Sequence, residues 1–190
     1  VYVQQKQDGQ IFNVPLAVDI YAGGKKERHK VWVNGKSDTL TFRVASKPDL
    51  VNFDGDKIIL CKKTDNKSLD EFAFQYFNAP RDRDRCESIE AAQSKEAEAA
   101  GQKIILAALK DKYYGLRLKA VRALKMNNKE IHDAALPVLT TLAKSDANTL
   151  VRAAALTALG KLKDPAYMNI YKEASGSQSY AVQGAALTAI

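Results

Sequence analysis

The chain has 190 residues, of which 46% are hydrophobic, 27% charged and 8% aromatic. This length suffices for one or two compact domains, and the composition is that of a globular protein rather than a disordered one. No apolar run approaches the length of a membrane span and no signal peptide is recognisable, so we expect no membrane partner.

The first third of the chain alternates apolar and polar residues. Examples are Leu16-Ala-Val-Asp-Ile20, His29-Lys-Val-Trp-Val33 and Leu40-Thr-Phe-Arg-Val44. A period of two with β-branched and aromatic residues predicts half-buried antiparallel strands. The predicted strands cover residues 1–7, 11–22, 26–33, 37–45, 49–53 and 57–63.

Turn-forming pairs separate these strands. Asn34-Gly35 lies between two alternating runs and predicts a hairpin. The other turns are Asp8-Gly9, Gly23-Gly24, Lys47-Pro48 and Asp54-Gly55. Short strands at this spacing predict a small antiparallel β-sandwich of the immunoglobulin-like type. A polar span at 64–68 predicts the junction, so we expect domains at 1–67 and 68–190.

Four segments beyond this junction carry apolar residues at i, i+3 and i+4. They cover residues 68–77, 98–110, 129–143 and 165–174. This spacing predicts amphipathic helices with one buried face. Asp164-Pro165 is a helix-start pair, because Asp caps the first turn and Pro fits the first helical position.

A second helix follows each of these, and the second helices repeat. In Asp111–Leu124 and again in Asp146–Leu159, an Asp stands six residues before an Arg and the Arg seven before a Leu. A third copy contains Gln183 and matches at the apolar positions, and a weaker first copy contains Arg85. Self-similarity at this period predicts a solenoid of stacked helix pairs. The expected fold is therefore multidomain α and β: a β-sandwich followed by an all-α, HEAT-like superhelical solenoid of about four helix pairs.

The repeated Asp and Arg residues predict a structural ladder. Asp111 and Asp146 fall in turns between paired helices, and Arg117 and Arg152 lie about two turns into the second helices. Stacking would place each Arg near the Asp of its own or the adjacent repeat. We interpret these pairs as packing devices rather than catalytic groups. Since Arg85 and Gln183 lack an Asp six residues earlier, the ladder is expected to weaken at both ends.

Residues for chemistry are sparse. His29 and His132 have no companions at metal-ligand spacing, and there is no His-Glu-x-x-His, phosphate-binding glycine loop, nucleophile elbow or Cys–His signature. We therefore expect no catalytic, metal or cofactor residue in this chain. The aromatic residues on apolar faces are expected to be core: Trp32, Phe42, Tyr76 and Phe77.

Cys61 and Cys86 fall in different predicted domains. A disulfide would require them to face each other across the junction, which sequence leaves open, as it does their redox state and the compartment. Buried free thiols are the favoured interpretation.

The net charge of +7 leaves nucleic-acid binding as an alternative. The basic runs Lys25–Lys30 and Lys62-Lys63 contribute much of this charge, whereas Arg81-Asp-Arg-Asp-Arg85 largely neutralises itself. Charges around a hairpin turn are commonly solvated and discourage edge pairing, and no groove-reading or base-stacking motif accompanies them. A solvated surface is therefore favoured over nucleic-acid binding.

Several stretches resemble a known family. They are Val1–Gln7, Pro15–Ile20, Leu50-Val-Asn-Phe-Asp-Gly-Asp-Lys-Ile-Ile-Leu-Cys-Lys-Lys63, Ser68–Arg85 and Asp111–Ala120. Together and in this order, they resemble the C-terminal part of aminopeptidase N-type (gluzincin) zinc metallopeptidases. The bacterial branch, whose members end in HEAT repeats, is the most similar.

The resemblance implies a longer parent enzyme, in which a saddle domain and a thermolysin-like catalytic domain would precede Val1. Zinc and the catalytic Glu of His-Glu-x-x-His would belong to that missing domain, so no site residue carries over to this chain. This part would support the catalytic domain and gate peptide access to its cleft, while the parent removes N-terminal residues from peptides. The apparent start inside a strand and end inside a helix also lead us to expect a fragment.

Two other hypotheses stay open. A catalytically dead relative could act as a protein-interaction scaffold through the solenoid, and a basic solenoid could bind nucleic acid. The sequence leaves substrate preference, oligomeric state and the activity of the parent undetermined.

Overall fold

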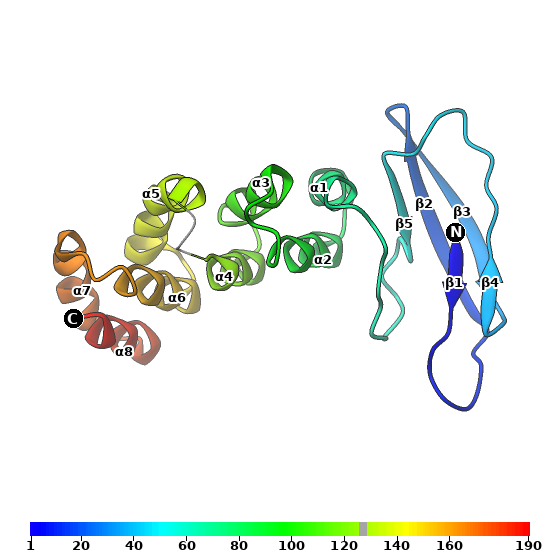
Figure 1. Cartoon of the computed structure of the whole chain (residues 1–190). Coiled ribbons are helices and arrows are strands. Elements are labelled where there is room, and N and C mark those ends of the chain that lie inside the picture. Colours follow the sequence, from blue (N-terminus) through cyan, green and yellow to red (C-terminus); the bar gives the residue numbers. More distant parts are fainter. Residues whose placement is uncertain (126–128) are drawn as a thin grey trace.

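A computed structural model describes residues 1–125 and 129–190 and contains a small β unit followed by a curved row of helices (Figure 1). The β unit has two antiparallel sheets. One pairs β1 with β4, and the other has the order β3-β2-β5. The bounds are β1 (Tyr2–Gln4), β2 (Val14–Ala22), β3 (Lys25–Val33), β4 (Ser37–Thr39) and β5 (Leu50–Phe53).

The β unit is a small antiparallel sandwich with both faces of its central strand buried. Leu16, Val18 and Ile20 on one face of β2 form a core to which Val3 of β1 and the segment after β4 contribute. The alternate residues of β2, Ala17, Asp19 and Tyr21, are also buried. They face the first helices and the loop after β5, since the Tyr21 ring packs edge-on against Phe74 of the first helix at 5.7 Å. The covering helices therefore complete the burial of this strand.

The predicted hairpin at Asn34-Gly35 is wrong. β3 pairs with β2, whereas β4 pairs with β1, so this turn passes the polypeptide from one sheet to the other. The Asp38 carboxylate holds the turn by accepting hydrogen bonds from the backbone N–H groups of Asn34 and Gly35. The hairpin between β2 and β3 turns at Gly23-Gly24, whose φ angles of 56° and 73° favour glycine.

The predicted strand at 57–63 is also absent, and those at 1–7, 11–22 and 37–45 are shorter than predicted. The carboxylate of Asp54 accepts hydrogen bonds from the backbone N–H groups of Ile58 and Ile59 at 3.1 Å, which uses donors that a strand ladder would need. The segment instead runs as an irregular connection toward the first helix (Figure 1).

Within the described residues, the helical row consists of four successive pairs, as the apolar spacing predicts. Ser68 and Glu71 form a capping box at the first helix, and Asn148 and Asp164 cap later ones. The bounds are α1 (Leu69–Asn78), α2 (Asp82–Ala92), α3 (Ala99–Ala108), α4 (Tyr114–Ala123), α5 (Lys129–Ser145), α6 (Thr149–Gly160), the 3₁₀ turn η1 (Pro165–Tyr167), α7 (Met168–Ser175) and α8 (Tyr180–Ala189).

The pairs stack into an arch with the second helices on its inner side (Figure 1). Ala120, Ala155 and Ala186 are fully buried at equivalent places in α4, α6 and α8, which lets these helices approach closely. A Cβ added to Gly160 of α6 would lie only 2.7 Å from the Cβ of Ala189. One continuous apolar core runs along the row from Leu69 to Ala186. Leu187 and Ile190 lie outside this core and are exposed, since no described element packs on the far side of α8.

Candidate interaction surface

A buried polar network joins the β unit to the helical row. Asp84 of α2 is fully buried, and its Oδ1 accepts a hydrogen bond from Asn52 Nδ2 of β5 and lies 2.9 Å from the Nζ of Lys57. Lys57 also reaches the carboxylate of Glu87 at 3.3 Å. Gln75 of α1 donates to the Asp84 carbonyl and to Glu87. Strand, loop and both helices of the first pair thus meet at one cluster of satisfied polar groups.

The connection between the two parts contributes a second cluster of charges. Lys63 and Lys67 both bind the Asp65 carboxylate, at 3.1 and 2.8 Å, and Lys67 also donates to Gln75. Burial acts to raise the pKa of Asp65, but the two ammonium groups outweigh it and hold that pKa below its usual value. Burial lowers the pKa of Lys67. The linker is therefore fixed to α1 rather than left free.

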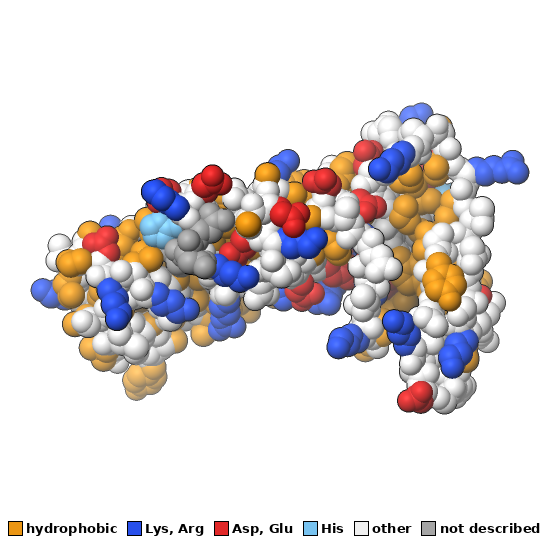
Figure 2. Space-filling view, in the orientation of Figure 1, with side chains coloured by type: hydrophobic (Ala, Val, Ile, Leu, Met, Phe, Trp, Pro, Cys, Tyr) orange, Lys and Arg blue, Asp and Glu red, His pale blue; other side chains and the backbone are white. Residues whose placement is uncertain are grey.

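Part of the basic run of the β unit is neutralised within the fold. The Arg28 guanidinium binds both oxygens of the fully buried Asp19 at 2.6 and 2.8 Å, and Lys26 binds the same carboxylate at 2.9 Å. Despite the opposing effect of burial, these cations lower the pKa of Asp19. On the face in Figure 2, basic and acidic side chains are interspersed along the helical row. No continuous basic stripe is visible on that face.

The residues expected to form the ladder lie along the turn edge of the row. Arg117 donates from Nε and Nη2 to the two carboxylate oxygens of Asp146, at 2.7 and 2.8 Å, and from Nη1 to the Asp111 carbonyl of its own turn. Asp146 also accepts the backbone N–H of Asn148 at 2.8 Å. Burial opposes ionisation of Asp146, but Arg117 lowers its pKa overall. The carboxylate pairing therefore runs from one repeat to the next.

The expectation that the ladder weakens at Arg85 is wrong. Arg85 Nε donates to Asp111 at 2.8 Å, and Tyr76 of the first pair donates its hydroxyl to the same carboxylate at 2.9 Å. Since each Arg binds the Asp of the following repeat, Arg85 needs no Asp before it. Burial, together with the hydrogen bond to Asp111, raises the pKa of Tyr76.

Arg152 differs from its two counterparts. Its side chain makes no hydrogen bond or ion pair with the described residues, and its buried Nε has no partner among them. Where Asp111 and Asp146 occur in the earlier turns, the last turn has Ser177, whose hydroxyl accepts the N–H of Ser179. Gln183 of α8 donates to the Ser175 carbonyl of its own turn.

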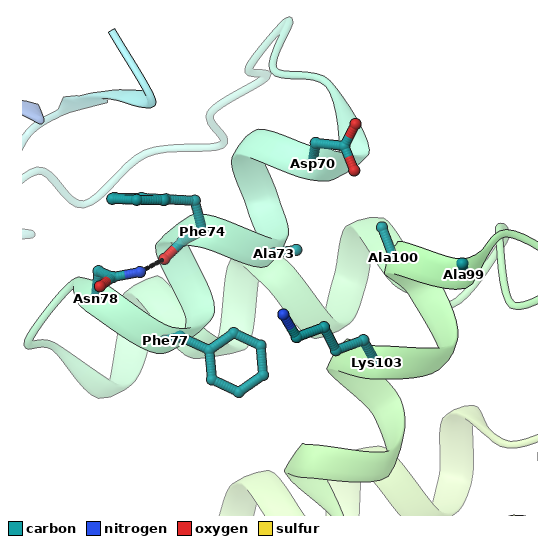
Figure 3. Close-up of a pocket in the computed structure, with 8 residues that line it drawn as sticks. All are labelled: Asp70, Ala73, Phe74, Phe77, Asn78, Ala99, Ala100 and Lys103. Atoms are coloured by element: carbon teal, nitrogen blue, oxygen red, sulfur yellow. Dashed lines mark hydrogen bonds between the residues drawn. The ribbon is translucent and has the colours of Figure 1, made fainter. Parts of the chain in front are cut away.

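An open cleft of about 510 Å³ lies between α1 and α3 (Figure 3). Phe77 is 48% exposed there, and the Lys103 ammonium sits 5.0 Å from its ring centre. The lining residues are Asp70, Ala73, Phe74, Phe77, Asn78, Ala99, Ala100 and Lys103. A mostly apolar floor with one acid and one base at its rim suits a segment of another polypeptide.

Several residues lie on the surface instead of in the core. Trp32, which pairs with Pro15 near the end of the β2–β3 ladder, is 59% exposed, and Phe77 faces the cleft. Tyr76 is buried and Phe42 is half-buried. Both cysteines are free thiols, with Cys61 exposed and Cys86 half-buried. Burial raises the pKa of the Cys86 thiol, and the adjacent Glu90 adds to this effect.

His29 and His132 lie apart, the first against the Phe42 ring and the second beside Asp133. Among residues 1–125 and 129–190, no group of three or more His, Cys, Asp or Glu side chains could hold a metal ion. In the same residues, no helix combines the length and apolar character needed to cross a membrane.

Comparison with protein families identifies HEAT repeats over residues 101–190. The matched range begins within α3 and includes the three later helix pairs. A search of curated proteins finds no match to this sequence. The helical row is thus HEAT-like, and HEAT repeats form helical scaffolds that typically serve protein interaction. The resemblance to aminopeptidase N-type enzymes has no counterpart in these matches.

Proposed function

We propose that this protein is the non-catalytic C-terminal part of a bacterial aminopeptidase N-type zinc peptidase. In this proposal, residues 1–67 form a β-sandwich domain and residues 68–190 form a HEAT-like domain. The observation that carries it is the succession of a small β-sandwich and a HEAT-like solenoid along the sequence. This is the order that the resembling stretches imply.

The proposed role is to support a catalytic domain and to limit which peptides reach its cleft. The buried cluster around Asp84 and Lys57 supports this role, because it holds the solenoid at one angle to the sandwich. The arch then acts as a wall whose inner side is formed by α2, α4, α6 and α8. The zinc and the general base would be supplied by the preceding part of the parent enzyme.

The test starts with the gene. We expect a His-Glu-x-x-His motif within the few hundred residues encoded before Val1, and an upstream sequence without it would overturn the proposal. The full-length protein should contain one zinc and release N-terminal residues from peptides. The present 190 residues, assayed alone under the same conditions, should release none.

The gating role has its own test in the full-length enzyme. The native enzyme and an Asn52→Ala variant, in which the polar joint around Asp84 and Lys57 is loosened, should cleave an aminoacyl anilide at the same rate. Cleavage of peptides of about ten or more residues should change, since their access depends on where the arch stands. Equal cleavage rates for the native enzyme and the Asn52→Ala variant at every peptide length would contradict the gating role. Such a result would not affect the assignment of the parent as a zinc peptidase.

A protein-interaction scaffold is the second candidate, and the cleft between α1 and α3 favours it. The cleft has a mostly apolar lining and a half-exposed Phe77, whereas a solvated helix surface is mostly polar. The scaffold would be favoured over the peptidase by two results together. The full-length protein would contain no zinc, and it would bind a stable folded partner that the Phe77→Ser variant no longer binds.

A further inference from the structure

The turn edge of the helical row contains three equivalent arginines, and two of them bind a carboxylate. Arg85 binds Asp111 and Arg117 binds Asp146, each across to the next repeat, with Nε donating at 2.8 and 2.7 Å. Arg152 occupies the same place in α6 and has no such partner in the described residues. The series therefore ends on a guanidinium to which the described part of the fold offers no carboxylate.

The cause is a change of residue type and not a change of backbone. Asp111 and Asp146 each accept the N–H of the residue two positions later, at 2.9 and 2.8 Å. Ser177 does the same with Ser179 at 3.2 Å. The three turns are thus built alike, but the third has a hydroxyl where the others have a carboxylate.

An unpaired guanidinium in this position favours a ligand. The Nε of Arg152 is buried without a partner among the described residues, and leaving a buried donor unsatisfied is costly. The planar fork of Arg matches a carboxylate in a bidentate manner, which the Arg117–Asp146 pair displays in the same surroundings.

We propose that Arg152 and Ser177 form a binding site for a carboxylate of another polypeptide, either an Asp or Glu side chain or the C-terminal carboxylate. The guest carboxylate would take the position that Asp146 takes beside Arg117, accepting from Arg152 and from the Ser177 hydroxyl. This site is independent of the proposed peptidase parent, since it uses only α6 and the turn before α8.

The test follows the arginine Nε–Hε signals in ¹⁵N spectra of the whole protein. The probes are N-acetylaspartic acid α-amide, whose carboxylate mimics that of an Asp residue, and N-acetylglycine, whose carboxylate mimics a polypeptide terminus. We expect at least one probe to shift the Arg152 signal saturably, while the Arg117 signal, already paired with Asp146, stays in place. The probe that binds more tightly identifies the source of the carboxylate.

Two substitutions at one position provide the control. Ser177→Asp should supply the carboxylate internally, move the Arg152 signal toward that of Arg117, raise the melting temperature and abolish the response to both probes. Ser177→Asn keeps the turn acceptor without the charge and should still respond. Arg152→Gln should remove the signal and should bind neither probe in calorimetry.

Three results would overturn the proposal. The first is no saturable shift with either probe up to high millimolar concentration. The second is an equal shift with chloride at the same ionic strength, which identifies an adventitious ion only. The third is an undiminished response in a folded Ser177→Asp variant, which would place the binding elsewhere.

Discussion

The β unit and the helical row are stabilised by different means. The row has a continuous apolar core in which each pair buries the next, so its stability comes from many equivalent contacts. The sandwich has only four buried residues in its own apolar cluster: Leu16, Val18, Ile20 and Val33. Its remaining burial comes from α1, α2 and the loop after β5, through Asp19, Asn52 and Tyr21. This difference indicates that the stability of the sandwich depends on its contacts with the helical row more than the stability of the row depends on the sandwich.

The largest effect is expected from breaking the polar joint. Asp84→Ala would leave Glu87 as the carboxylate partner of the Lys57 ammonium, whose side chain is 7% exposed, and would remove the acceptor of the Asn52 Nδ2 hydrogen bond. Removing one partner of a buried ion pair costs about 3–5 kcal/mol. We expect this loss of unfolding free energy in urea titrations, with the sandwich opening first. Asp82→Ala, on the exposed side of the same helix, is the matched control and should cost less than about 1 kcal/mol.

Two cavity variants test the direction of dependence. Ile89→Ala in α2 and Ile20→Ala in β2 each remove a buried branched side chain, for about 2–5 kcal/mol. We expect Ile89→Ala to weaken amide-exchange protection in both parts, since α2 covers the sandwich. Ile20→Ala should weaken it in the sandwich and leave α5 to α8 protected. If Ile20→Ala reduced amide-exchange protection in α5 to α8 as much as in the sandwich, the one-sided dependence would be wrong.

Acid should act on both regions through their buried carboxylates. The pKa values of Asp19 in the sandwich and Asp146 in the row are lowered on folding. Groups with a depressed folded pKa stabilise above the unfolded value of about 3.9, and this stability is lost as pH falls through the folded pKa. The melting temperature should therefore be flat between about pH 5 and 7 and fall below about pH 4. Asp146→Asn should reduce that acid dependence, whereas Asp8→Asn, in an exposed loop, should preserve it.

The smallest effect is expected from an exposed ion pair between the second helices of the first two pairs. Lys119 and Glu90 pair at 2.7 Å across α4 and α2, but their side chains are 33% and 42% exposed. Exposed pairs contribute about 0–1 kcal/mol. Glu90→Gln should therefore leave the urea midpoint nearly unchanged. If Glu90→Gln lowered the unfolding free energy nearly as much as Asp84→Ala, solvated and buried ion pairs would contribute equally to the stability of this protein.

Local patterns predicted the helices well. The spacing at 68–77 and 165–174 corresponds to α1 and to η1 with α7, because helix formation depends on residues three and four apart and on caps such as Ser68. The strands were harder, since a strand needs a distant partner. Residues 57–63 have strand-like composition, yet the Asp54 carboxylate occupies the backbone N–H groups of Ile58 and Ile59.

The polar joint lay beyond sequence reasoning for the same reason. Asp19 and Asn52 stand inside apolar strands, which is a signal that the second face of the sheet is also buried. Asp19 finds its partners, Lys26 and Arg28, on the neighbouring strand, but Asn52 binds Asp84 of α2, and no local pattern connects Asn52 with Asp84. The direction of the ladder was likewise left open, because residue spacing alone does not say whether Arg117 binds Asp111 or Asp146.

That direction has a consequence for how the protein is made. Arg117 and the carboxylate it binds are 29 residues apart, and the acceptor always lies on the C-terminal side. As the ribosome extends the polypeptide, the first and second helix pairs emerge with Arg85 and Arg117 unpaired until the turn of the following repeat has been translated. The nascent row therefore has an unpaired arginine at its growing end until the next turn supplies Asp111 or Asp146, whereas the last turn supplies Ser177 and leaves Arg152 without a carboxylate among the described residues.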